Sequence, residues 1–430
     1  MNYCSGQMQV EEGLAVPRME GPQAAADADA VQPWRPLAGI RVVELTGWVA
    51  GPQAGVILGD LGADVVKVES PHAPDPTRSH TAAQGLSMRT ASGHLMCWET
   101  FNRNKRSLAL DLSTEQGQRV LYQLVAKSDV FLTNMRESAL ERLGASFERL
   151  KTANPTLVYG VAGGLGAKGP RANDPVVDAI GMAYSGFMYA VSARQDEPWY
   201  PHGSLTDIQT GTMVAFGIVT ALFARSSRND AQYVHSSQLQ SMMWLQNFNI
   251  AMAANNGTMF DAHVYASPAF SVYQCGDGEW IALALIHGDS PVRSPWPVLF
   301  KLFGKPELTD DPRFASDAVR DLHRDELKAV MISGFKERER DYWVATLQSA
   351  GIMCSGIKRV TDLVTDEHVA AEGYIFQLDN GLKFMRSCFE LGDVPTKGSP
   401  ELGADTHQIL LGLGLTEDEI ISLHLADVVM

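Results

Sequence analysis

The chain has 430 residues, 45% of them hydrophobic and 20% charged, so it can bury a large core, and its length suggests two or three domains. Its formal net charge of −15 argues against nucleic acid or an anionic membrane as a partner. The five scattered cysteines lack C-x-x-C spacing and the eleven histidines lack metal-ligand spacing, so we expect a cytoplasmic protein without disulfides or a metal.

Residues 1–35 differ in composition from the rest of the chain. They are rich in Ala, Asp, Gly, Pro and Gln. They lack the basic start and apolar core of a signal peptide, and they are too acidic for a transit peptide. We expect a disordered tail.

A βαβ unit is predicted from residue 36 onward. The run at 40–45 predicts a strand, Pro52 suits the first turn of a helix that ends near Gly62, and 64–69 predicts a second strand. This order implies a parallel sheet with helices on its faces. The turn after the first strand lacks G-x-G-x-x-G, and the match at 164–169 runs into Pro170. With no G-x-S-x-G or P-loop present, dehydrogenase, hydrolase and nucleotide-binding functions are disfavoured.

The remaining pattern predicts a larger first α/β block and a smaller second block. In the first block we expect helices at 114–127, 137–151, 176–190 and 208–225 and a strand at 157–161. In the second we expect a helical segment at 236–254, a strand pair near 268–285 with a turn at 276–278, and helices near 294–304, 323–337 and 339–350. Residues 404–429 predict amphipathic helices, with Thr416 as the cap of the last one.

Asp207 is the first candidate for chemistry. It lies just ahead of the apolar stretch 211–224, whose 14 residues are too few for a membrane span and indicate a buried helix. A carboxylate at the head of a helix faces the positive end of the helix dipole, which favours the ionised form. This position predicts a nucleophile or base, although an N-cap aspartate would have the same spacing.

A basic cluster at 102–111 (NRNKRSLALD) stands out in an acidic chain. Guanidinium groups bind phosphate bidentately, so this cluster is a candidate phosphate or diphosphate site. Solvated surface charge is the alternative, and the spacing alone does not decide between them.

Here the chain resembles the family III CoA-transferases. The resemblance covers roughly residues 36–430 in order, through segments that include PLAGIRVVEL (36–45), LGADVVKVE (61–69), DPTR (75–78), NRNKRSLALD (102–111), NPTLVY (154–159), TDI (206–208), DPRF (311–314) and LGADTH (402–407). It implies that Asp207 is a nucleophile that carries first an acyl group and then CoA. CoA and its esters would be substrates, with no permanently bound cofactor.

The resemblance also implies which positions contact CoA. These are Val49, Ala50, Ser70, Leu110, Asp111, Leu112, Ser113, Asn134, Met135, Arg136, Arg142, Pro175, Val176, Val177 and Asp178. Arg136 and Arg142 are the stronger phosphate candidates by their chemistry. For Arg106, a surface ion pair remains an equal alternative.

Departures from the family's pattern narrow the reaction and its substrate. Val177 stands where racemases of the family have the His before the aspartate that matches Asp178, so racemisation, which needs two acid/base groups, is disfavoured. Val49 stands where oxalate-specific members have Gln, and the glycine-rich active-site loop is not recognisable between 255 and 300. If some of the bulky residues near the site line the pocket, the acyl group is larger and more apolar than oxalate. These residues are Trp48, Met182, Tyr184, Phe187, Met188, Tyr189, Met242, Met243, Trp244 and Phe248.

The resemblance implies an α/β fold with a Rossmann-like parallel sheet and a smaller α+β domain. We expect a large α/β domain at 36–228, linker helices and the small domain at 229–376, and a return to the large domain at 377–430. Two ring-shaped chains would interlock as a homodimer. A CoA-transferase that acts on an acyl-CoA donor and a free carboxylic acid is the favoured function, and an acyl-CoA racemase or isomerase and a non-catalytic CoA-ester-binding protein are the alternatives.

Overall fold

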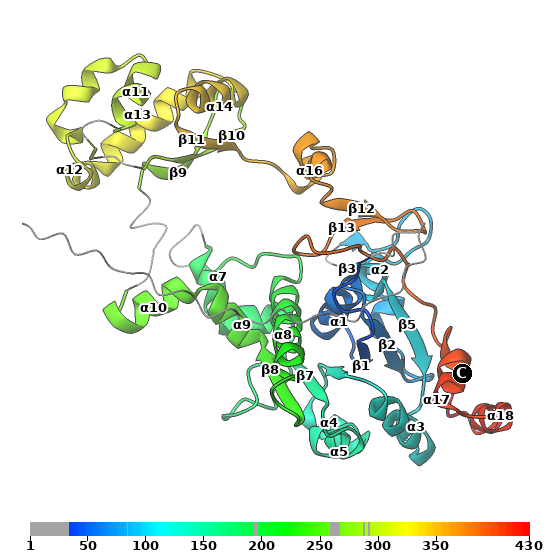
Figure 1. Cartoon of the computed structure of the whole chain (residues 1–430). Coiled ribbons are helices and arrows are strands. Elements are labelled where there is room, and N and C mark those ends of the chain that lie inside the picture. Colours follow the sequence, from blue (N-terminus) through cyan, green and yellow to red (C-terminus); the bar gives the residue numbers. More distant parts are fainter. Residues whose placement is uncertain (1–33, 84, 193–196, 259–266, 287–288, 291–292) are drawn as a thin grey trace, which may run out of the picture. The chain divides into compact units, whose positions relative to one another are not determined.

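A six-stranded parallel sheet is the centre of the fold (Figure 1). The computed structural model describes residues 34–83, 85–192, 197–258, 267–286, 289–290 and 293–430, so nearly all of the tail expected at 1–35 lies outside the described residues. The strand order is β5-β2-β1-β6-β7-β8, and all neighbours pair in parallel. The strands are β1 (Arg41–Leu45), β2 (Asp64–Glu69), β5 (Lys105–Ala109), β6 (Val130–Thr133), β7 (Val158–Gly163) and β8 (Gln232–Ser237). The predicted α/β class is confirmed, and the order is the doubly wound one.

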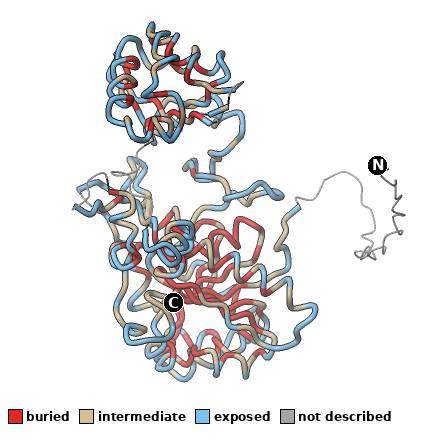
Figure 2. Tube along the Cα trace, turned by 90° about the vertical axis from the view of Figure 1, so that its left-hand side faces the viewer, coloured by how far each residue is buried: buried red, intermediate tan, exposed pale blue. Residues whose placement is uncertain are grey.

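Helices cover both faces of this sheet, which is why most side chains of its inner strands are buried. Val42 and Val43 are adjacent in β1, but they point into different cores because side chains alternate along a strand. One core includes residues of α1 (Ala50–Asp60) and α8 (Leu205–Ala224). The other includes residues of α3 (Glu115–Ala126), α4 (Glu137–Arg142), α5 (Phe147–Ala153), α17 (Thr406–Leu413) and α18 (Glu417–Leu425). Figure 2 shows the buried residues gathered in the interior, with exposed residues around them.

Two predicted helices are each broken into two by a left-handed glycine. The helix expected at 137–151 is α4 and α5, with Gly144 between them at φ +69°. The helix expected at 176–190 is α6 (Asp178–Tyr184) and α7 (Phe187–Ala190), with Gly186 at φ +78°. Glycine reaches positive φ without a steric penalty and ends a helix there. Of the segment expected to be helical at 236–254, the start belongs to β8, and α9 (Gln238–Leu245) and α10 (Asn247–Asn256) follow.

The apolar helix α8 is longer than the sequence pattern predicted. It has 20 residues and is long and apolar enough by composition to cross a membrane. Its Val214 and Ile218 are nevertheless fully buried in the core cluster that it shares with α1. This packing against the sheet is that of a core helix of an α/β domain.

A second, antiparallel sheet has the order β11-β10-β9. The predicted strand pair is confirmed as β9 (Phe270–Gln274) and β10 (Trp280–Ala284), and β11 (Met353–Gly356) pairs with β10. Its core includes Phe335 and Trp343. The helices nearby in sequence are α11 (Trp296–Leu302), α12 (Asp317–Leu322), α13 (Arg324–Lys336) and α14 (Arg340–Ser349). The shorter elements are β3 (Ala82–Ala83), β4 (Leu86–Ser87), α2 (Met96–Asn102), α15 (Val360–Leu363), α16 (Glu367–Ala371), β12 (Ile375–Gln377) and β13 (Lys383–Met385).

The C-terminal segment covers the edge strand β5. The Asp405 carboxylate accepts the Ser107 N–H at 2.9 Å, and the Thr406 hydroxyl accepts the Ala109 N–H at 3.1 Å. An antiparallel bridge joins Leu110 to Val429. These contacts occupy backbone groups that an exposed edge strand would leave open. The predicted Thr416 cap of α18 is confirmed, as a capping box with Glu419.

Candidate active site

The point where the strand order reverses lies between β1 and β6. In open α/β sheets, ligands bind in the crevice outside the carboxyl ends of the strands at such a point. The loop between β1 and α1 follows one strand, and Asn134 follows the other. The Asn134 side chain accepts the Gly47 N–H at 3.1 Å and donates to the Gly47 carbonyl at 2.7 Å. Asn134, predicted as a CoA contact, therefore uses its amide to hold this loop.

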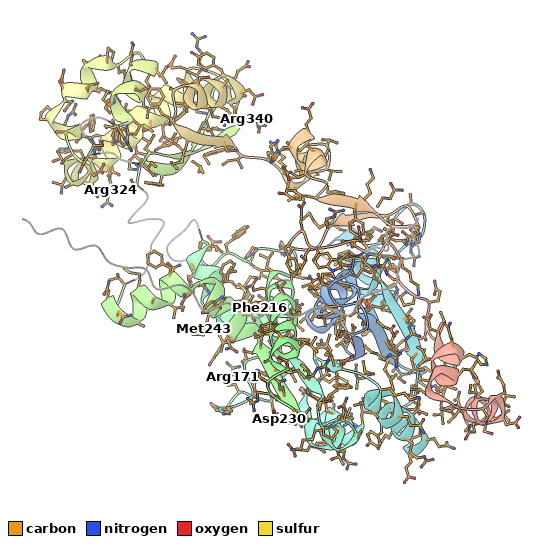
Figure 3. All side chains as sticks on the ribbon, viewed as in Figure 1. Arg171, Phe216, Asp230, Met243, Arg324 and Arg340 are labelled. Atoms are coloured by element: carbon orange, nitrogen blue, oxygen red, sulfur yellow. The ribbon has the colours of Figure 1, made fainter. Side chains whose placement is uncertain are left out.

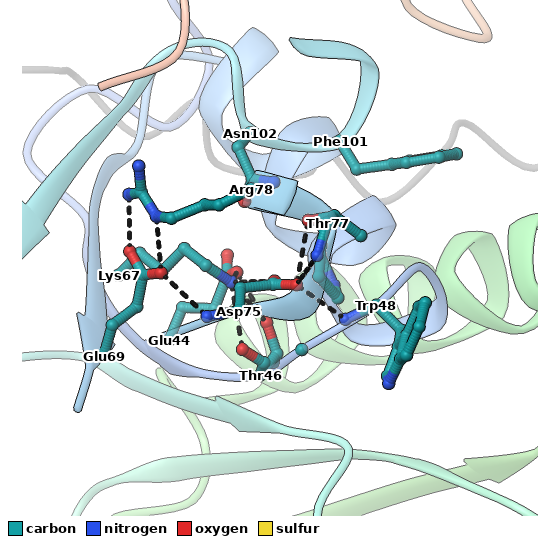
Figure 4. Close-up of polar contacts among 12 residues, drawn as sticks. Glu44, Thr46, Trp48, Lys67, Glu69, Asp75, Thr77, Arg78, Phe101 and Asn102 are labelled. Atoms are coloured by element: carbon teal, nitrogen blue, oxygen red, sulfur yellow. Dashed lines mark hydrogen bonds and ion pairs between the residues drawn. The ribbon is translucent and has the colours of Figure 1, made fainter. Parts of the chain in front are cut away.

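Trp48 in the same loop has an unusual backbone. Its φ is +62°, in the left-handed region that non-glycine residues rarely adopt, and its side chain is 51% exposed. The Trp48 N–H donates to Asp75 Oδ1 at 3.2 Å (Figure 4). Strained backbone of this kind persists where surrounding contacts fix it, and it occurs preferentially at functional sites.

A buried cluster of charged side chains packs against the β1–α1 loop (Figure 4). Lys67 Nζ lies 3.3 Å from Glu44 and 3.0 Å from Asp75, and it donates to the Thr46 carbonyl at 3.0 Å. Lys105 Nζ lies 2.8 Å from Glu44. Both ammonium groups are fully buried. Burial lowers the pKa of Lys67, but the neighbouring carboxylates, Glu44 first, outweigh it and raise that pKa.

The basic cluster at 102–111 is explained by internal ion pairs. Lys105 belongs to the buried cluster, and burial lowers its pKa to about 8. Arg103 pairs with Asp60 at 2.6 Å. Arg106 binds both oxygens of Asp64, at 2.8 and 2.6 Å, so the ion-pair alternative for this residue is confirmed. The three cations have partners within the chain and are not a ready-made phosphate site.

Asp207 lies in the first turn of α8, but it is not the N-cap. The N-cap is Ser204, so that alternative is wrong. Asp178, the first residue of α6, supplies the cap from another helix, since its Oδ1 accepts the N–H groups of Thr206 at 2.8 Å and Asp207 at 3.2 Å. The Asp207 carboxylate is held by Gln238, whose Nε2 donates to Oδ1 at 2.5 Å.

The charge state of Asp207 differs from the sequence expectation. Burial, followed by the negative charge of Asp178, raises the pKa of Asp207 to about 7, while the Gln238 hydrogen bond lowers it. The helix end was expected to favour the ionised form, but desolvation and a like charge outweigh that tendency. Near neutral pH, both protonation states of Asp207 are therefore populated.

Asp207 and the β1–α1 loop lie in one region. One helical turn after Asp207, a Cβ at Gly211 would come within 2.6 Å of the Ala50 carbonyl oxygen and 2.7 Å of Gln53 Cβ, so only glycine lets α8 approach the start of α1. Burial raises the pKa of the Cys97 thiol to about 11, and the charges of Asp75 and Asp207 both contribute. The strained loop and the candidate nucleophile are therefore close to each other in the fold.

The other predicted CoA contacts fall into three groups. Side chains of one group lie in the core and leave only backbone groups for a ligand; they are Val49, Ala50, Leu110 and Leu112. Arg136 and Arg142 are exposed and have no ion pair among the described residues. Partly or fully accessible positions complete the set, and they are Ser70, Asp111, Ser113, Met135, Pro175, Val176 and Val177. The two free guanidinium groups remain the phosphate candidates.

Sequence reasoning missed Gln238 because nothing in the pattern at 236–254 links that residue to Asp207. The bulky apolar residues expected around the site fall into buried and exposed ones. Met182 and Met242 are fully buried in the protein. Met243 and Trp244 line a groove of about 830 Å³ with Met213 of α8, and Figure 3 shows Met243 on α9 beside α8. Asp207 is not among the lining residues of this groove, so it is a separate surface feature.

The chain is similar to known proteins over most of its length. The family model described as CoA-transferase family III matches residues 37–406. The chain is similar to an acetyl-CoA:oxalate CoA-transferase from Acetobacter aceti, with 28% identity over 80% of this chain and 87% of that protein. It is also similar to a succinyl-CoA–D-citramalate CoA-transferase from Chloroflexus aurantiacus, with 29% identity over 91% and 98%. A solved structure of a CAIB/BAIF family protein from Brucella suis matches with TM-score 0.75 and 29% identity, covering 89% of this chain and 100% of that one.

Proposed function

The chain belongs to CoA-transferase family III, and from this premise we propose that Asp207 is the residue that carries the transferred groups. Moving CoA from a thioester to a free acid without ATP requires a group that can hold an acyl residue and then CoA. A carboxylate can do both. The observation that supports Asp207 is its position: a partly buried carboxylate at the start of α8, with one oxygen bound by Gln238.

The reaction then proceeds through two covalent intermediates on Asp207, a mixed anhydride and a thioester. Oδ2 of ionised Asp207 attacks the donor thioester carbonyl, the C–S bond breaks, and a mixed anhydride and CoA thiolate form. The thiolate attacks Cγ of Asp207, the Cγ–Oδ2 bond breaks, and the donor acid leaves with that oxygen. The resulting aspartyl-CoA thioester is attacked by the acceptor carboxylate, and the thiolate finally takes the acyl group of the acceptor. Because only the ionised form attacks, a pKa near 7 keeps Asp207 both nucleophilic and available.

We further propose that Arg136 and Arg142 bind phosphate groups of CoA. Both are exposed and without an ion pair among the described residues, whereas Arg106 is committed to Asp64. Loss of one charge-assisted contact should raise the KM for acyl-CoA roughly tenfold in Arg136→Ala or Arg142→Ala. Arg106→Ala is the matched control and should leave that KM near the wild-type value. An unchanged KM in both test variants would remove these residues from the site.

The acyl group is proposed to be larger and more apolar than oxalate. Relatives of similar identity are named for oxalate and for D-citramalate, so similarity does not select the acid. What supports a bulkier group is apolar surface near the nucleophile: Val177 and Ile180 of the α6 region and Trp48 of the loop are 63%, 46% and 51% exposed. A panel of acyl-CoA donors and free acids tests this. Turnover restricted to small dicarboxylates would contradict it.

We also propose a homodimer in which the two chains interlock, as the family resemblance implies. Large apolar side chains on α8 and α9 support a partner, since Phe216, Phe223 and Trp244 are 69%, 85% and 63% exposed. Light scattering should give about twice the 46.8 kDa chain mass, with no dissociation on dilution. A monomer at micromolar concentration would contradict this proposal.

Trapping of the aspartyl intermediate tests the central assignment. Incubation with acyl-CoA and borohydride, followed by peptide mass spectrometry, should modify Asp207. Asp207→Ala should abolish trapping and reduce transfer by more than about 10⁴-fold, the scale of losing a nucleophile. Asp418→Ala, which removes an exposed carboxylate from another first helical turn, is the matched control. Full transfer in Asp207→Ala, or loss of α-deuterium from acyl-CoA without an acceptor acid, would refute the assignment.

A further inference from the structure

Gln238 is the side chain closest to the chemistry that the proposed reaction does not yet use. It is the first residue of α9, directly after β8, and it is 5% exposed. Its Nε2 donates to Asp207 Oδ1 at 2.5 Å. Its Oε1 is buried and has no hydrogen-bond partner among the described residues, so only the amide hydrogens of this side chain are in use.

Packing fixes Gln238 in this orientation. A Cβ at Gly181 of α6 would lie 2.5 Å from Gln238 Oε1 and 2.8 Å from Gln238 Cβ, so α6 presses against the side chain. Thr206 borders the same space, because the Cβ added at Gly181 would also lie 2.9 Å from Thr206 Cγ2. The donor is therefore held in place before the reaction begins, which is the condition for electrostatic preorganisation.

The two oxygens of Asp207 are thereby made different. Oδ1 receives the Gln238 hydrogen bond, whereas Oδ2 accepts no hydrogen bond from any described residue, so Oδ2 is the oxygen that is free to attack. In the anhydride and in the aspartyl-CoA thioester, Oδ1 is the carbonyl oxygen of Asp207. Whenever thiolate or carboxylate attacks Cγ, the negative charge develops on Oδ1.

We propose that Gln238 is a catalytic residue that stabilises the oxyanion on Asp207 Oδ1 during the steps at Cγ. This inference rests on the proposed role of Asp207 as the nucleophile. Two steps are involved: thiolate attack on the anhydride, in which the Cγ–S bond forms and the donor carboxylate leaves, and acceptor attack on the thioester, in which a C–O bond forms and thiolate leaves. In each, the electron pair of the C=O bond moves to Oδ1 and returns when the leaving group departs, while Gln238 keeps its protons.

A neutral amide suits this task better than a cation. A lysine or arginine at this position would hold the carboxylate strongly and weaken it as a nucleophile. The Gln238 N–H binds the carboxylate, the carbonyl and the oxyanion, and it binds the oxyanion most strongly because that oxygen carries the most charge. The stabilisation is therefore greatest at the tetrahedral intermediate.

The test uses the full-length enzyme and Gln238→Met, which keeps the side-chain length but removes the donor. We expect kcat to fall by roughly 10²–10³-fold, the scale for one oxyanion-hole donor, with the KM for acyl-CoA within about threefold of wild type. Gln240→Met is the matched control, since Gln240 is an exposed glutamine of the same helix. Gln238→Asn, which retains an amide but shortens the side chain, should lie between Gln238→Met and wild type.

A split between the two intermediates identifies the step. With acyl-CoA alone, Gln238→Met should still release thiol, detected with a chromogenic disulfide, while the borohydride-reduced aspartyl-CoA adduct falls at least tenfold. Unchanged kcat, or equal loss of thiol release and adduct, would overturn the inference. If Asp207→Ala is inactive and Gln238→Met matches wild type, the proposed function stands and only the Gln238 role fails. If Asp207→Ala transfers CoA normally, the proposed function itself fails.

Discussion

Two groups of carboxylates near the β1–α1 loop differ in how their charge is balanced. Next to the loop, the carboxylates of Glu44 and Asp75 are matched by two ammonium groups. These belong to Lys67, which contacts both carboxylates (Figure 4), and to Lys105, which contacts Glu44. At the start of α8, Asp207 and Asp178 are both carboxylates, and no described cation forms an ion pair with either.

This difference in charge balance suggests different roles: the paired group fixes the geometry of the loop, and the unpaired group is the reactive one. Paired buried charges fix geometry, because moving either partner leaves the other unsatisfied. An unpaired buried carboxylate has a raised free energy when ionised, and attack on an electrophile relieves it. Asp178 contributes to both effects, since it caps the helix that carries Asp207 and also raises the pKa of that residue. We therefore assign the first group to holding the loop, and the second group contains the proposed nucleophile.

The largest expected effect comes from breaking the paired group. Lys67→Met leaves Glu44 and Asp75 without one of their two cations in a fully buried position, which should reduce the free energy of unfolding by about 3–5 kcal/mol. Denaturant unfolding measures this. Lys151→Met removes an exposed ion pair with Glu148 and should cost less than about 1 kcal/mol. A loss below 1 kcal/mol for Lys67→Met would show that the cluster is not structural.

Removing charge from the unpaired group should stabilise the fold instead of destabilising it. The folded-state pKa of Asp207, about 7, lies above its ordinary value of 3.8, so folded protein binds this proton more tightly than the unfolded chain. Stability is therefore lost as pH rises from about 4 to about 7. Asp207→Asn stays neutral and should melt about 2–4 °C above wild type at pH 8. The gain should vanish at pH 4. A lower melting temperature than wild type at pH 8 would contradict the comparison.

The pH dependence of activity tests the same charge directly. Because ionised Asp207 is the proposed nucleophile, kcat/KM should fall tenfold per pH unit below about 7. Asp178→Asn removes the second cause of the raised pKa, and its amide oxygen can still accept the N–H groups of α8, so the acid limb should move to lower pH. Asp174→Asn removes a carboxylate that lies four residues before Asp178 and is not among those causes, so it should leave the limb in place. An unmoved limb in Asp178→Asn would separate Asp178 from Asp207.

Local patterns in the sequence predicted much of the fold. The strand at 64–69 and the cap at Thr416 follow from apolar runs and capping chemistry, and both are confirmed. Strand β5 was missed because its buried Lys105 resembles surface charge in the sequence. The partner that makes it a core residue, Glu44, is 61 positions away. Strands β6 and β8 were not predicted either.

The candidate site was likewise predicted only in part. Asp207 was found from its place before an apolar helix and from family resemblance. Gln238 was not, because its contact with Asp207 joins positions 31 apart on different elements. The raised pKa of Asp207 depends on burial and on Asp178, and neither can be judged from spacing. Local signals identified the position, and tertiary contacts set its chemistry.

The smallest expected effect comes from loosening the loop while leaving the nucleophile untouched. Asn134→Ala removes both hydrogen bonds to Gly47, so the loop should lose its fixed position at a stability cost of about 1–2 kcal/mol. The KM for acyl-CoA should rise about fivefold, the size of one lost hydrogen bond. The kcat should stay within about twofold, because Asp207 is held separately by Asp178 and Gln238. Asn255→Ala, which removes an exposed amide bound to Ala251, is the control. An equally large fall in kcat for Asn134→Ala would mean that loop and nucleophile act as one unit, and the division between support and reactivity would then fail.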